Sequence, residues 1–134
     1  MINFLKLYFI SLPVLLIIDS VWLLFVAPKF YKTHIGFLMT DKPNLVAALI
    51  FYLLFIAGLV IFVVQPGLES HSLLNTLLKG ALFGLVCYAT YDLTNQATIN
   101  NWPTIVTVVD LIWGTLLTAS VSGVVFVIAS KLNV

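Results

Sequence analysis

Three aspartates stand inside the long apolar stretches of this sequence. Asp19, Asp92 and Asp110 are the only acidic residues within the segments that we predict to span a membrane. An ionisable group at the centre of a bilayer costs about 3 kcal/mol or more, and less near the interface. With a rise of about 1.5 Å per residue, the three carboxyl groups fall in the same half of the membrane. We therefore expect them to face one another around a shared pocket.

Such a cluster suits acid–base chemistry or the binding of a cation or hydrogen-bond donor. Carboxyl groups that lie close together cannot all ionise at low cost, which favours proton transfer. Neutral hydrogen-bonding side chains occur nearby, including amides and hydroxyls. The candidate pocket comprises Asp19, Trp22, Tyr91, Asp92, Asn95, Asn101, Thr107, Asp110 and Trp113.

Tryptophans accompany two of the aspartates at a fixed spacing. Trp22 follows Asp19 by three residues, and Trp113 follows Asp110 in the same way. At this spacing the two side chains share a helix face, so the indole could donate to the carboxylate or wall the pocket. Trp102 instead suits the aromatic belt at the membrane surface.

Composition agrees with a membrane protein and excludes several other classes. The chain has 134 residues, of which 62% are hydrophobic and 8% charged, and its length predicts one domain, 1–134. It has no arginine and six scattered lysines, so we expect no nucleic-acid partner. A single cysteine, Cys87, excludes an internal disulfide and a multi-cysteine metal site, and we expect no metal. Whether the protein binds a cofactor stays open.

Four apolar stretches predict the elements that position the candidate residues. A helix needs about 20 apolar residues to cross a bilayer. The stretches cover about residues 4–28, 45–64, 73–96 and 103–130. The sequence therefore predicts an all-α polytopic membrane protein, built as a four-transmembrane-helix bundle with short loops.

The second predicted helix and the segment before it have distinct compositions. Residues 29–44 mix lysines with aromatic and aliphatic residues, which suits a segment lying in the membrane interface, although a solvated loop is the alternative. The second helix carries no polar side chain apart from Tyr52, so we expect it to face lipid. We expect Gln65, Pro66 and Gly67 to end it.

Small residues recur at helical spacing on the third and fourth predicted helices. Such rows let membrane helices approach closely. We expect the two helices to pack along Gly80, Gly84, Gly114 and Thr118. Alternatively, Gly80 and Gly84 line the seam of a homodimer.

The motifs "YDLTNQATINNWP", "DLIWG" and "DSVW" together resemble those of the small bacterial integral-membrane proteins catalogued as domain of unknown function 2177. The similarity covers essentially the whole chain. It implies a four-helix protein of the bacterial inner membrane, and it implies no activity or catalytic residue.

Three functions remain open at this point. The first is a pocket that binds or acts on a lipid or small hydrophobic molecule, with membrane lipids as partners. The second is a proton- or cation-coupled transporter or channel subunit that works as an oligomer, because intramembrane carboxylates mark such pathways. The third is a structural or accessory subunit in which the aspartates join helices. Whether the protein is an enzyme, and which side the aspartates face, stay open.

Overall fold

The computed structural model describes residues 3–134, and over this range every regular element is a helix. Residues 1 and 2 of the predicted domain lie outside the described residues. In the described part, four helical segments are long and apolar enough to cross a membrane: Phe4–Phe25, Leu45–Glu69, Leu73–Thr98 and Thr104–Leu132. The predicted all-α fold with four membrane-spanning helices is confirmed.

The first span is shorter than the predicted helix 4–28. Helix α1 covers Phe4–Phe25, and a second helix, α2, covers Ala27–Ile35. The division lies beside Pro28, which has no N–H to continue a helix but is favoured in a first turn. The proline accordingly stands at the start of α2. A short 3₁₀ turn, η1 (Gly36–Leu38), follows, so much of the predicted interfacial segment is helical.

The second span continues beyond the predicted end at residue 64. It consists of α3 (Leu45–Leu59), the π-helical segment η2 (Val60–Val64) and α4 (Gln65–Glu69). The Gln65 N–H bonds to the Val60 carbonyl, five residues back. This wider turn comes directly before Pro66 and accommodates its ring and missing N–H, so the helix does not end there.

The buried side chains of the second span all lie beyond Leu54. Side chains from Leu45 to Leu54 are largely exposed, whereas most of those in the second half are buried or half-buried, with Ile61 and Phe62 still exposed. The fully or almost fully buried residues are Ile56, Leu59, Val60, Val63 and Val64. The expectation that this whole helix faces lipid is therefore wrong, because η2 packs against α1, α5 and α6.

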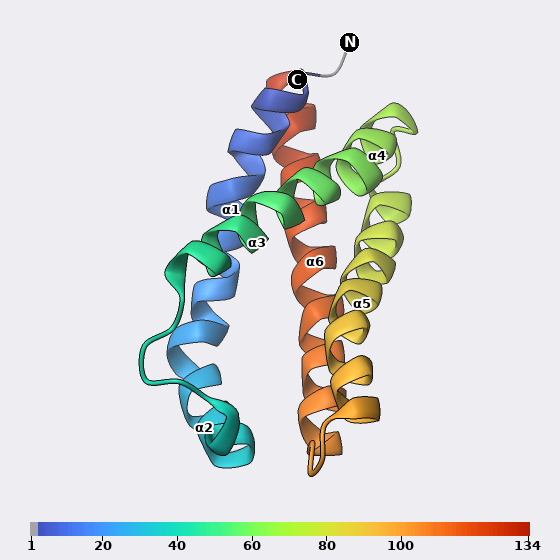
Figure 1. Cartoon of the computed structure of the whole chain (residues 1–134). Helices are drawn as coiled ribbons and strands as arrows, with labels where there is room; N and C mark the ends of the chain where they lie inside the picture. Colours follow the sequence, from blue (N-terminus) through green and yellow to red (C-terminus); the bar gives the residue numbers. More distant parts are fainter. Residues whose placement is uncertain (1–2) are drawn as a thin grey trace.

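The third and fourth spans, α5 (Leu73–Thr98) and α6 (Thr104–Leu132), form an antiparallel pair (Figure 1). A Cβ placed on Gly84 would collide with the backbone carbonyl of Gly114 and come within 2.5 Å of Thr118 Oγ1. One on Gly80 would lie 2.5 Å from Ser122 Oγ. These glycines therefore lie within the chain's own α5–α6 contact.

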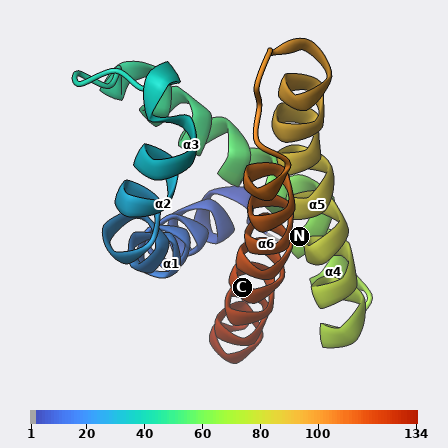
Figure 2. The same cartoon turned by 90° about the horizontal axis from the view of Figure 1, so that it is seen from below.

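The helices separate toward one end of the molecule. The start of α1 and the end of α6 lie together at one end, and α2 lies at the other end with the α5–α6 turn (Figure 1). Seen from that second end, α1, α2 and α3 lie on one side and α5 and α6 on the other (Figure 2). The aspartates lie in the half that contains α2 and the α5–α6 turn. The apolar core fills the other half, near the termini.

Candidate functional site

Asp19 is held by two side chains from other helices. It lies on α1 and is 5% exposed. The Tyr52 phenol on α3 donates to its Oδ2 at 2.5 Å, and Trp113 Nε1 on α6 donates to its Oδ1 at 3.4 Å. This carboxylate thus connects three of the four spans.

Asp110 binds the short helix α2. The Tyr31 hydroxyl donates to Asp110 Oδ1 at 2.6 Å. Burial, followed by the neighbouring Asp110 carboxyl, raises the pKa of Tyr31 well above its usual value. The phenol therefore keeps its proton and remains a donor, which fastens α2 to α6.

Asp92 differs from the other two aspartates because it lacks a hydrogen-bond donor. It is 1% exposed, and neither carboxyl oxygen has a hydrogen-bond partner within the described residues. The Asp110 carboxyl lies beside it, and two such groups can hydrogen-bond to each other only when one of them carries a proton. A buried polar group without a partner is rare in folded proteins.

A cavity of about 390 Å³ lies beside the two carboxyl groups. Residues from α2, α3, α5 and α6 line it: Tyr31, Phe51, Cys87, Tyr88, Tyr91, Asp92 and Asp110. Tyr88 lies within electrostatic reach of Asp19, Asp92 and Asp110 alike. One tyrosine therefore lies near all three aspartates, and two of the aspartates border the cavity.

The tryptophans of the two D-x-x-W motifs contact each other. The rings of Trp22 and Trp113 stack with their centroids 4.9 Å apart and an angle of 12° between the planes. Trp22 also meets the ring of Tyr31 edge-on at 6.3 Å. This aromatic layer links the surroundings of Asp19, through Trp113, to those of Asp110.

Four other candidate residues lie at or beyond the margin of the site. Tyr91 is 60% exposed at the rim of the cavity, and Asn95 is half-buried. Asn101 is exposed in the α5–α6 turn, where its φ of 61° is one that asparagine tolerates. Thr107 accepts a 3.0 Å hydrogen bond from Trp102 Nε1, and Trp102 is buried rather than part of an exposed belt.

Three tyrosines of the site were not among the predicted residues: Tyr31 and Tyr88, which line the cavity, and Tyr52, which binds Asp19. Tyr52 offered a signal, because it was the only polar side chain recognised in the second helix. Tyr88 shares a face of α5 with Asp92 at a spacing of four residues. Tyr31 offered none, because its position depends on the fold of α2 back toward α6.

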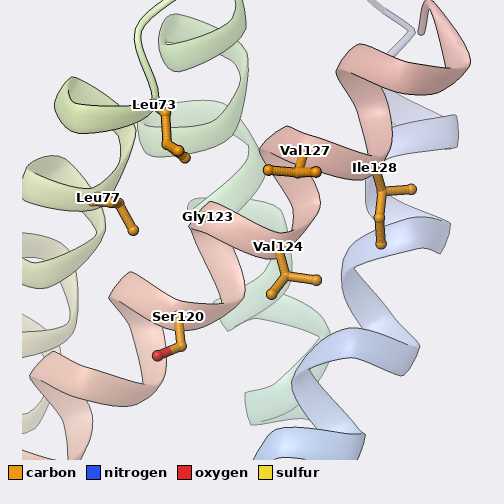
Figure 3. Close-up of a pocket in the computed structure, with 7 residues that line it drawn as sticks. All are labelled: Leu73, Leu77, Ser120, Gly123, Val124, Val127 and Ile128. Atoms are coloured by element: carbon orange, nitrogen blue, oxygen red, sulfur yellow. The ribbon is translucent and has the colours of Figure 1, made fainter.

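A second cavity lies in the other half of the molecule. It has a volume of about 460 Å³ and lies between α5 and α6, with Leu77 opposite Gly123 (Figure 3). Ser120 is the only polar residue among those that line it. Within residues 3–134, no group of three histidine, cysteine or acidic side chains could hold a metal ion.

Comparison with known proteins identifies a family. A family model described as "Predicted membrane protein (DUF2177)" matches residues 4–127. No curated protein and no solved structure matches the chain.

Proposed function

The chain belongs to the DUF2177 family of predicted membrane proteins, and we propose that its aspartates line an intramembrane pocket for a lipid or a small hydrophobic molecule. The proposal rests on Asp92, whose carboxyl group is buried, unpartnered and adjacent to a cavity of about 390 Å³. Leaving such a group without a partner costs about 1–3 kcal/mol. A ligand that brings a donor would remove this cost.

The size and lining of the cavity support a ligand rather than a proton alone. Ligand pockets typically measure about 300–1,000 Å³ and combine apolar walls with a few polar groups. Here aromatic side chains make most of the wall, and two carboxyl groups supply the polar part. Either carboxyl could also act as an acid or base on a bound molecule.

Transport by a path through the bundle is less well supported. The half near the termini is filled by apolar side chains, among them Leu7, Leu15 and Val125, each at most 1% exposed. The buried Ser11 and Ser122 hydroxyls there donate to backbone carbonyls of their own helices. Within residues 3–134 the buried polar side chains other than the three aspartates are hydroxyls, so a proton or cation leaving the aspartates would meet no further buried ionisable group.

A purely structural role accounts for Asp19 but not for Asp92. Asp19 accepts hydrogen bonds from α3 and α6 and so joins helices. Asp92 contributes no comparable bond, and an asparagine or serine there would avoid the cost of burying a carboxyl. The lipids of a bacterial inner membrane are the proposed source of the ligand.

Native mass spectrometry of protein extracted in a mild detergent tests this function. The comparison uses the wild-type chain, Asp92→Asn, and Asp41→Asn, which makes the same change in an exposed loop. We expect a co-purifying small molecule on the wild type and on Asp41→Asn, and its loss from Asp92→Asn. Identical spectra for all three proteins would overturn the proposal, and the same spectra report monomer or homodimer.

A further inference from the structure

We infer that the cavity beside Asp92 recognises the ammonium group of a cationic amphiphile, an inference that rests on the function proposed above. The group is either a primary amine or a quaternary ammonium on an apolar chain. Its positive charge would lie against Asp92 and Asp110, and its chain would extend toward the lipid.

The lining of the cavity has the composition of a site for an organic cation. Four of the seven lining residues are aromatic, namely Tyr31, Phe51, Tyr88 and Tyr91. Aromatic faces attract ammonium groups, and this attraction grows where water is excluded. None of the seven is a lysine or a histidine, so no cationic side chain of the lining offsets the two carboxyl groups.

The side chains at the rim of the cavity are exposed to the surroundings, and the carboxyl groups at its floor are buried. Tyr91 and Phe51 are 60% and 51% exposed, whereas Asp92 and Asp110 are 1% and 5% exposed. The exposed part of the lining is therefore aromatic, from Phe51 on α3 and Tyr91 on α5, while the carboxyl groups are buried. An amphiphile matches this order, with its charged group inward and its chain outward.

Other ligand classes fit this lining less well. A divalent cation such as Ca²⁺ takes 6–8 oxygen ligands, and an aromatic wall cannot complete such a shell. An anionic headgroup would meet two carboxyl groups and no compensating cation. A neutral alcohol would supply a donor to Asp92, but it would gain little from the aromatic faces.

Titration with amphiphiles of equal chain length tests the inference. Purified protein in a neutral detergent receives dodecylamine, dodecyltrimethylammonium, dodecanol or dodecanoate, and the thermal midpoint of unfolding is recorded. We expect a saturable rise with the two cationic compounds only. The rise should disappear in Asp92→Asn and persist in Asp41→Asn.

A second variant, Phe51→Leu, tests the inference even if Asp92→Asn does not fold. Phe51 is half exposed on α3, so Phe51→Leu removes an aromatic face without opening the core. We expect it to weaken dodecyltrimethylammonium binding by about 2- to 5-fold. Unchanged affinity would remove the aromatic part of the inference.

Bilayer nanodiscs separate the two sources of an ammonium group. Discs of ethanolamine-headed lipid are compared with discs of glycerol-headed lipid of the same chains, each with and without added dodecylamine. An Asp92-dependent stabilisation by the ethanolamine lipid alone identifies a headgroup as the ligand. Stabilisation that requires dodecylamine identifies a free amphiphile.

The outcomes also distinguish this inference from the function on which it rests. If dodecanol stabilises as well as dodecylamine, and Asp92→Asn removes both effects, the pocket stands and the ammonium inference fails. If no compound shows an effect that depends on Asp92 in detergent or in nanodiscs, both fail.

Discussion

The phenol of Tyr52 on α3 donates a 2.5 Å hydrogen bond to the carboxylate of Asp19 on α1. This bond joins the first half of the second span, which is otherwise mostly exposed, to the rest of the bundle. Hydrogen bonds between membrane helices contribute about 0.6–2 kcal/mol. We expect Tyr52→Phe to lower the free energy of unfolding by about 1 kcal/mol, measured by reversible denaturation in mixed detergent micelles.

A matched control for this measurement is Tyr91→Phe. Tyr91 is 60% exposed, and its hydroxyl makes no hydrogen bond within residues 3–134, so its removal should leave the stability unchanged. Equal losses for Tyr52→Phe and Tyr91→Phe would show that the hydrogen bond to Asp19 does not join the helices.

Asp92 and Asp19 should respond in opposite directions to the same substitution. Asp92→Asn removes a buried carboxyl that has no donor, and its new amide could donate to Asp110. We expect this variant, freed of ligand, to gain about 1 kcal/mol of stability. Asp19→Asn should lose stability, because Tyr52 and Trp113 donate to its two different oxygens and an asparagine keeps only one acceptor oxygen. Unfolding in detergent measures both, and a loss for Asp92→Asn would mean that its carboxyl stabilises the fold.

The four spans follow from the sequence for a simple reason, and the depth of the aspartates stays a prediction. The length of an apolar run and the rise of a helix are local properties, and counting residues gives a depth. The exposure of a helix face is not local. The sequence therefore marks Tyr52 as polar but does not identify its partner. The hydrogen bond from Tyr52 to Asp19 depends on how α3 packs against α1.

Two features of the fold could not be predicted from the sequence, because a proline at each position is compatible with two different local structures. Pro28 can end one helix or begin the next, and the structure places it in the first turn of α2. Pro66 normally breaks a helix, yet the π-helical turn at Val60–Val64 lets the span continue. The position of Tyr31 against Asp110 depends on the first of these choices.

Gly84 should tolerate no side chain. A Cβ there would collide with the carbonyl of Gly114, which belongs to the backbone of α6 and cannot rotate away. Overpacking of this kind costs about 1–3 kcal/mol. We expect Gly84→Ala to lower the thermal midpoint, whereas Gly36→Ala, whose Cβ would lie 3.8 Å from Lys32 Cγ, should not. If both variants melt like the wild type, α5 and α6 are not in close contact at Gly84.

The hydrogen bond from Tyr31 to Asp110 should control how firmly α2 is held. Within the described residues it is the one hydrogen bond that a side chain of α2 donates to another span, and Tyr31 also contacts Trp22. Because the pKa of Tyr31 is raised by burial and by Asp110, the neutral phenol is the form that the folded state favours. The bond should therefore persist through neutral and mildly alkaline pH, and be lost only as the pH rises through the raised pKa.

Hydrogen exchange of the amides of α2 at neutral pH measures this hold. Tyr31→Phe keeps the ring but removes the donor, so we expect faster exchange across α2 and unchanged exchange in α6. Thr33→Val is the matched control, because it removes a hydroxyl that bonds only to Lys29 of the same helix. Equal exchange of α2 in Tyr31→Phe and the wild type would mean that packing of α2, rather than its bond to Asp110, holds the helix over the cavity.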